Sequence, residues 1–143
     1  MQYLDSSALV KRYVPEPDSA NVRAAIRRDP HIASSIMSFA EVRAALAAAS
    51  RAGRFASSSD LARTVAQFRR DWSRCAAIAV DLTLVDAAGD LTERHGLRAY
   101  DAVQLASALV ASRAGRRPRR IAFGTFDANL RAAAAAEGLP LLF

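Results

Sequence analysis

Short apolar segments separated by amphipathic helical segments are the feature that most restricts how this chain can fold. The apolar segments have the length of strands, which we expect at residues 2–5, 31–34, 76–80, 119–125 and 139–143. Strands that alternate with helices form parallel sheets covered on both faces. The pattern therefore predicts an α/β fold, and ligands of such sheets bind beyond the carboxyl ends of the strands.

Helices are expected between these strands, at positions set by capping residues, glycines and prolines. Ser6 or Ser7 can cap a helix over about 7–13, which is broken by the prolines of VPEPDSA. Gly53 and Gly138 mark two further helix ends. The remaining helices are expected at about 19–28, 38–52, 60–75, 83–95, 99–114 and 127–138. No repeat or long linker interrupts the pattern, so one domain spanning 1–143 is expected.

The charge balance is basic, and almost all of the positive charge is arginine. The net charge is +6 and Lys11 is the only lysine. Such a balance favours nucleic acid or an acidic protein as partner. A genome rich in GC would also enrich alanine and arginine, so charge alone leaves both explanations open.

Cellular location is predicted from what the sequence lacks. No apolar run is long enough for a membrane span, and no basic segment followed by an apolar one opens the chain. Cys75 is the only cysteine and cannot form an internal disulfide, which agrees with a reducing compartment. We therefore expect a cytoplasmic protein without membrane contact.

Four acidic residues are poorly explained as ordinary surface charge. Asp5 and Asp127 each follow an expected strand, at the edge where ligands bind. In SIMSFAEVRAALAAAS, Glu41 interrupts an apolar helical face formed by Met37, Ala44, Ala45 and Ala48. In GLRAYDAVQLASALV, Asp101 interrupts one formed by Leu97, Leu105 and Ala108. Burying a lone carboxylate is costly. Either helical acid is also explained, if taken alone, by a place at the helix edge or by pairing with a nearby arginine.

Convergence of these four acids would require a cation. Hard divalent ions prefer carboxylate oxygens, so Mg²⁺ or Mn²⁺ suits an all-carboxylate site. Such an ion lowers the pKa of a bound water and stabilises charge on a phosphoryl group. The acids, the cation and the basic exterior together indicate hydrolysis of a phosphodiester.

Four segments in this order and spacing resemble the PIN domain, specifically the VapC-type toxin ribonucleases of bacterial toxin–antitoxin pairs. The segments are YLDSSALVKRY, SFAEVRAAL, LRAYDAVQLASAL and FGTFDANL, and the resemblance covers essentially the whole chain. It implies a three-layer α/β/α fold with a central, mainly parallel sheet of short strands. It also implies an Mg²⁺- or Mn²⁺-dependent endoribonuclease with a cognate antitoxin and a homodimeric state.

The resemblance assigns a role to each residue that matches its motifs. Asp5, Glu41 and Asp101 would be the core metal ligands, and Asp127 the fourth acid of the site. Small hydroxyl residues would support this arrangement; they are Ser6, Ser7 and Thr125. Metal-activated water would attack the phosphodiester in line, without a covalent nucleophile.

Three arginines are candidates for contact with RNA phosphates. Arg98 stands close to Asp101 in the sequence, whereas Arg116 and Arg117 lie in the basic segment SRAGRRPRR. That segment is equally explained as a solvated loop.

Rival readings of the acids fit less well. An aspartyl phosphatase would need Asp-x-Asp where this chain has Asp-Ser-Ser, a receiver domain would need a late lysine, and no P-loop is present. The remaining alternative is a non-catalytic PIN-fold module that binds RNA or protein.

Overall fold

Four parallel strands form the centre of the computed structural model, which describes residues 1–114 and 120–143. The strands are β1 (Gln2–Leu4), β2 (Ile32–Ser35), β3 (Ala76–Ile78) and β4 (Ala122–Gly124). They lie in the order β3-β2-β1-β4, with Tyr3 paired with Ala33 on one side and with Phe123 on the other. The prediction of a mainly parallel sheet is confirmed, since every strand pair is parallel.

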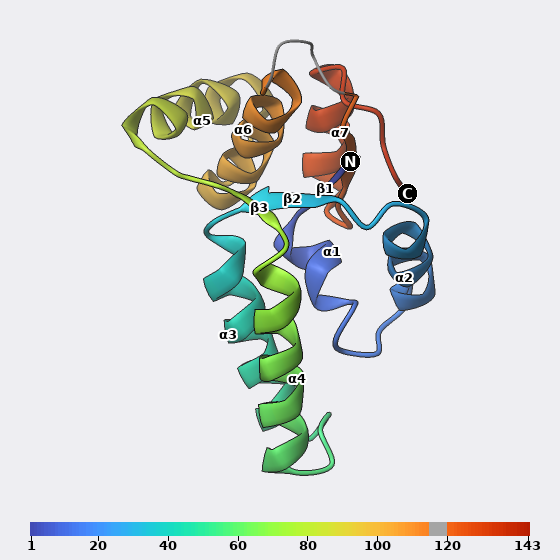
Figure 1. The fold of residues 1–143 in the computed structure, drawn as a ribbon. Coiled ribbons are helices and arrows are strands. Elements are labelled where there is room, and N and C mark those ends of the chain that lie inside the picture. Colours follow the sequence, from blue (N-terminus) through green and yellow to red (C-terminus); the bar gives the residue numbers. More distant parts are fainter. Residues whose placement is uncertain (115–119) are drawn as a thin grey trace.

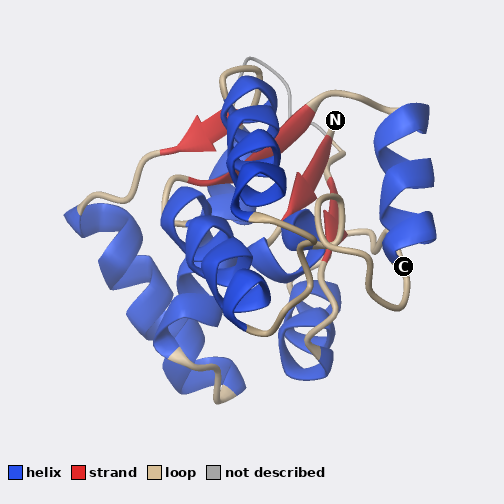
Figure 2. Ribbon diagram, turned by 90° about the horizontal axis from the view of Figure 1, so that it is seen from below, coloured by secondary structure: helices blue, strands red, loops and turns tan. Residues whose placement is uncertain are grey.

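Helices cover both faces of this sheet (Figure 1). On one face lie α1 (Ser6–Val10), α2 (Ser19–Arg28), α3 (Ser38–Arg51) and α4 (Ser58–Trp72). On the other lie α5 (Leu82–His95), α6 (Ala99–Arg113) and α7 (Ala128–Ala136). Figure 2, in which the molecule is seen from below, shows how short the strands are beside the helices. The three-layer α/β/α architecture is therefore confirmed, with α3 and α4 forming a hairpin that extends away from the sheet (Figure 1). Among the described residues, no helix has the length and apolar character to span a membrane.

Successive side chains of β1 enter the two cores on opposite faces of the sheet. Tyr3 is fully buried and stacks on Phe123, with ring centroids 5.4 Å apart, in the core beneath α5, α6 and α7. Leu4 is equally buried in the core beneath α1 to α4, where Phe68 is the largest fully buried side chain. The strand thus ends between two packed layers, and this fixes the position of the next residue, Asp5.

The buried face of α3 differs from the predicted one. The buried residues of α3 are Ser38, Val42, Leu46 and Ala49. Ala44 and Ala48, which were expected on the buried stripe with Glu41, are exposed, and Glu41 itself is half-buried. Valine and leucine remove more apolar area from water than alanine does, so they determine which face turns inward. Glu41 therefore lies at the edge of the packed face and not in its centre.

The corresponding prediction for α6 is confirmed. Leu97, Leu105 and Ala108 are buried, and Asp101 is half-buried within this stripe.

The strand expected at 139–143 does not form. Only one bridge joins the segment to the sheet, between Leu141 and Phe123. The Phe123 amide donates to the Pro140 carbonyl at 2.7 Å, and the Leu142 amide donates to the Phe123 carbonyl at 2.9 Å. Pro140 has no N–H to extend the ladder, which explains why pairing stops after one bridge.

Candidate active site

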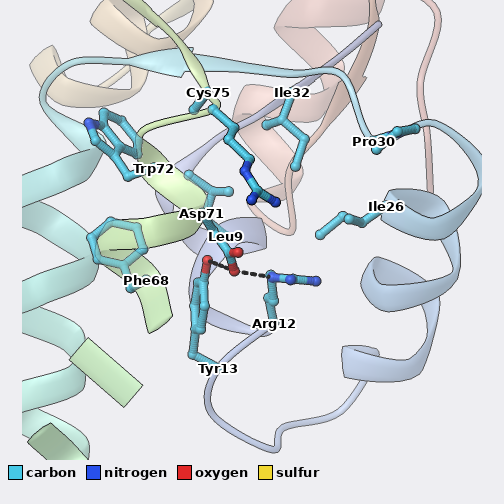
Figure 3. A pocket seen from close by; sticks show the side chains of 11 residues that line it. Leu9, Arg12, Tyr13, Ile26, Pro30, Ile32, Phe68, Asp71, Trp72 and Cys75 are labelled. Carbon is cyan, nitrogen blue, oxygen red and sulfur yellow. Dashed lines mark hydrogen bonds and ion pairs between the residues drawn. The ribbon is translucent and has the colours of Figure 1, made fainter. Parts of the chain in front are cut away.

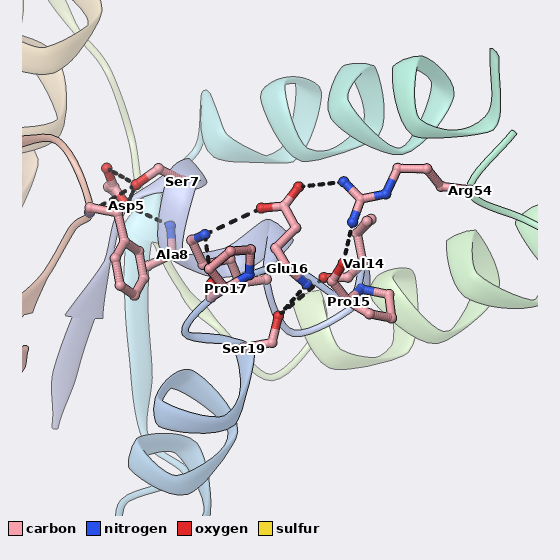
Figure 4. A network of polar contacts seen from close by, with 11 residues as sticks. Asp5, Ser7, Ala8, Val14, Pro15, Glu16, Pro17, Ser19 and Arg54 are labelled. Atoms are coloured by element: carbon pink, nitrogen blue, oxygen red, sulfur yellow. Dashed lines mark hydrogen bonds and ion pairs between the residues drawn. The ribbon is translucent and has the colours of Figure 1, made fainter. Parts of the chain in front are cut away.

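Asp5 is the buried carboxylate of the candidate site. It follows β1, it is only 4% exposed, and its side chain caps α1 by accepting the Ala8 amide at 2.8 Å. The hydroxyl of Ser7 lies 2.8 and 2.9 Å from its two oxygens (Figure 4). Thr125 Oγ1 donates to Oδ2 at 2.8 Å. The sequence predicted a serine cap for this helix, and that prediction is wrong. A carboxylate accepts several donors at once, so Asp5 caps the helix and remains fixed by the hydroxyls.

Burial raises the pKa of Asp5 to about 6, although three donors oppose this shift. The Ala8 amide, Thr125 and Ser7 lower the pKa, and the nearby Glu41 carboxylate raises it. A carboxylate in this position carries an unfavourable charge at neutral pH, which a bound cation would relieve.

The ends of β1 and β4 are joined by a short hydrogen-bonded connection. Thr125 Oγ1, which donates to Asp5, accepts the Asp127 amide at 3.1 Å. Ser7 Oγ accepts the Phe126 amide at 3.2 Å. Asp127 caps α7 through the Leu130 amide at 2.8 Å. Strand β1 has β2 on one side and β4 on the other, so these acids lie where the strand order reverses, the usual ligand position in such sheets.

Glu41 reaches the site from α3 and is held from α6. Its Oε2 accepts the side-chain amide of Gln104 at 2.9 Å. Gln104 is 3% exposed and follows Asp101 by one helical turn. The two helices belong to opposite layers, so this contact spans the edge of the sheet (Figure 1).

Asp101 lies in the first turn of α6, and its pKa is raised. Burial is the main cause, the Asp127 carboxylate adds to it, and the exposed Arg98 opposes it. Arg98 is therefore close enough to influence the acids, in agreement with its proximity in the sequence.

The Glu41 carboxylate is thus near enough to raise the pKa of Asp5, and the Asp127 carboxylate is near enough to raise the pKa of Asp101. Within the described residues, however, no three acidic, histidine or cysteine side chains stand close enough to form a ready-made metal cluster. Mg²⁺ usually keeps several waters and takes only one or two carboxylates together with substrate phosphates. The two carboxylate pairs at this edge of the sheet offer the oxygen ligands that such a partly hydrated ion takes.

Comparison with known proteins identifies the family. The PIN-domain family model matches residues 2–136. The chain belongs to the PIN-domain family. It is 34% identical over 136 residues to Ribonuclease VapC45 of Mycobacterium tuberculosis CDC 1551 / Oshkosh and to Ribonuclease VapC49 of strain ATCC 25618 / H37Rv. Each alignment covers 95% of this chain and 90% of the relative. A toxin–antitoxin complex from Klebsiella pneumoniae contains a chain with the same fold, with a TM-score of 0.69, 16% identity and coverage of 100% of this chain and 98% of that one.

The hydroxyl residues expected to support the acids differ in their contacts with Asp5. Ser7 and Thr125 donate to Asp5, whereas among the described residues Ser6 makes no such bond. Arg116 and Arg117 lie outside the described residues. Gln104 was missed. Its signal in the sequence is a polar side chain one turn after Asp101 in an otherwise apolar helix.

A separate pocket of about 150 Å³ lies between α1, α2 and α4 and is lined by none of the four acids (Figure 3). Asp71 in its wall accepts Arg12 Nε at 2.9 Å and the Tyr13 hydroxyl at 3.0 Å. Cys75 lines the same pocket, and burial raises the pKa of its thiol to about 11. The thiol is therefore protonated at neutral pH and a weak nucleophile.

Proposed function

We propose that this PIN domain is an endoribonuclease that uses Mg²⁺ or Mn²⁺, held by Asp5, Glu41, Asp101 and Asp127, to hydrolyse RNA. The observation that carries the proposal is the buried Asp5 carboxylate at the point of strand reversal, coupled to Glu41, in a chain 34% identical to two proteins named as ribonucleases. A phosphate-binding module would have no use for paired carboxylates at this position.

Some side chains would bind the cation, and others fix the orientation of the side chains that bind it. When bound, the cation supplies the charge that makes a water acidic and stabilises the phosphoryl oxygens. Asp5 presents its carboxylate in one orientation because Ser7, Ala8 and Thr125 restrain it. Asp101 and Asp127 form the second pair and complete the negative charge that attracts the cation. No serine or cysteine is required as a covalent nucleophile.

The basic exterior is proposed to bind the RNA. A net charge of +6 attracts a polyanion, and Arg98 beside Asp101 is the described arginine best placed to contact a phosphate near the cut. Roles for Arg116 and Arg117 remain predictions.

The proposal includes regulation by an antitoxin. Its support is the relationship to VapC proteins, together with a fold shared with a chain of a toxin–antitoxin complex. A homodimer and a cytoplasmic location are predicted on the same basis. The alternative is a module that binds RNA or protein without cutting. It differs from this proposal because it predicts no cleavage of RNA.

The deciding experiment is cleavage of a long mixed RNA by the parent and by Asp5→Asn, with Mn²⁺ or Mg²⁺ and with EDTA. Asp86→Asn is the matched control because Asp86 is an exposed acid on α5, away from the four acids. We expect metal-dependent cleavage by the parent and the control, and none by Asp5→Asn. Equal cleavage by Asp5→Asn would show that the acids are not the site. Binding of RNA without cleavage by any form would favour the binding module.

A further inference from the structure

The side-chain amide of Gln104 is fixed by three hydrogen bonds inside the protein. Its Nε2 donates to Glu41 Oε2 at 2.9 Å and to Ser38 Oγ at 2.9 Å. Its Oε1 accepts the hydroxyl of Tyr3 at 2.7 Å. Gln104 is 3% exposed, and Tyr3 and Ser38 are fully buried, so the bonds to Tyr3 and Ser38 do not compete with water, whereas the bond to Glu41 is part-buried.

The order of donors and acceptors permits only one orientation of this amide. The backbone N–H of Ser35 donates to the Tyr3 oxygen at 2.9 Å, and a backbone N–H has no other role than donation. The Tyr3 proton is therefore directed to Gln104 Oε1, which leaves both Nε2 protons for Ser38 and Glu41. The reversed amide would turn its oxygen toward the Glu41 carboxylate, where two acceptors would repel each other.

Glu41 has fewer restraints of its own than Asp5 has. It lies at the half-exposed edge of α3, whereas Asp5 is buried and held by three donors of its own. Gln104 engages Oε2 and directs the other oxygen, Oε1, to any ligand. The series of hydrogen bonds runs from Ser35 in β2 through Tyr3 in β1 and Gln104 in α6 to Glu41 in α3. It therefore connects this acid to the sheet.

We propose that Gln104 is a positioning residue that orients Glu41 for the divalent cation through the chain Ser35–Tyr3–Gln104. The proposal rests on the proposed function, because it assumes that Glu41 is a metal ligand. It goes beyond that function by assigning a role to two uncharged residues, Gln104 and Tyr3, that are not among the proposed metal ligands.

The test is Mn²⁺ affinity, measured by isothermal titration calorimetry without RNA, so that activity is not the readout. Gln104→Leu keeps most of the volume and removes the donor, and we expect the dissociation constant to rise by about tenfold, the lower end for residues that orient metal ligands. Tyr3→Phe keeps the stack on Phe123 but removes the donor to Gln104 Oε1 and the acceptor of the Ser35 N–H, while both Nε2 bonds of Gln104 stay, so a smaller rise of about threefold is expected. Asp86→Asn, at an exposed acid of α5 outside this hydrogen-bond network, is the control, with no change in the dissociation constant expected.

A double-mutant cycle separates positioning from a general effect on folding. In a Glu41→Gln background, Gln104→Leu should not weaken Mn²⁺ binding further, because no ligand carboxylate remains to be oriented. A further tenfold loss in that background would overturn the proposal. If Gln104→Leu does not fold, Tyr3→Phe decides alone, and unchanged affinity in that variant overturns the proposal.

The outcomes distinguish this inference from the proposed function. If the parent binds Mn²⁺, Asp5→Asn does not, and Gln104→Leu binds as the parent does, the positioning role is refuted and the metal site stands. If the parent itself does not bind Mn²⁺, both the metal site and the role of Gln104 are refuted.

Discussion

Replacement of Asp5 by asparagine should make the metal-free protein more stable at alkaline pH, although it removes a proposed metal ligand. Burial raises the pKa of this carboxyl from 3.8 to about 6. The folded state therefore binds more protons than the unfolded state between these values, and the free energy of unfolding falls as pH rises through this range. The shift corresponds to as much as about 3 kcal/mol at pH 8.

The asparagine removes this cost and loses part of the hydrogen bonding. Its Oδ1 still accepts the Ala8 amide and the Ser7 hydroxyl, but the amide group faces Thr125, whose hydroxyl loses its acceptor. One lost hydrogen bond costs about 1 kcal/mol. We therefore expect a variant about 2 kcal/mol more stable than the parent at pH 8, and of about equal stability near pH 4.5, where the parent carboxyl is mostly protonated.

Urea unfolding followed by circular dichroism, with EDTA at both pH values, measures this difference. Asp86→Asn is again the control, and its difference from the parent should stay within about 0.5 kcal/mol at either pH because the residue is exposed. The reasoning would be refuted if Asp5→Asn were less stable than the parent at pH 8, and if this difference were the same at pH 4.5. It would mean that the donors around Asp5 fully compensate its burial.

Three further predictions follow from packing and charge. Gly124→Ala should lower the free energy of unfolding by about 1–3 kcal/mol in urea titrations, because a Cβ there would lie 2.7 Å from the Leu4 side chain; unchanged stability would show that β4 and the C-terminal segment shift easily. Ser107→Ala should be neutral or stabilise by up to about 1 kcal/mol by thermal unfolding, because its buried hydroxyl makes no hydrogen bond of good geometry among the described residues, although it lies near enough to Tyr3 to lower the pKa of that hydroxyl. A clear loss of stability would show that the contact with Tyr3 is a stabilising hydrogen bond. His95 lowers the pKa of Glu137 and Arg94 adds to this, so Glu137→Gln should cost less than about 1 kcal/mol at pH 7, a solvent-screened contribution that disappears as pH falls below the Glu137 pKa; an equal cost at low pH in urea titrations would exclude the ion pairs as its source.

Local sequence patterns were sufficient for the order of the elements and for the edge of the sheet that carries the acids. Strand ends identify Asp5 and Asp127 because the strands are short and bounded by clear helix signals. The stripe around Asp101 was predicted correctly because leucines mark its buried face. The alanine-rich face through Glu41 was predicted wrongly, because alanines contribute little to the choice of face where valine and leucine compete with them.

Contacts between distant residues were beyond the reach of these patterns. Tyr3 and Gln104 are 101 residues apart, and neither spacing nor composition indicates that their side chains meet. Thr125 and Asp5 are separated by 120 residues, and their contact follows only from the pairing of β1 with β4. The cap of α1 was missed because serines are favoured at this position, and only the fold shows that the preceding aspartate turns back to the Ala8 amide.

The acids of the site come from all three layers of the domain: Asp5 and Asp127 from the ends of strands, Glu41 from the layer below and Asp101 from the layer above. Such a site exists only while the layers are docked, even if every helix and strand persists on its own. A compact state with native secondary structure and loosened tertiary packing would bind no cation at these residues. Conversely, a bound cation would stabilise the docked arrangement of the layers. Amide hydrogen exchange should therefore slow in the first turns of both α3 and α6 when Mn²⁺ is added.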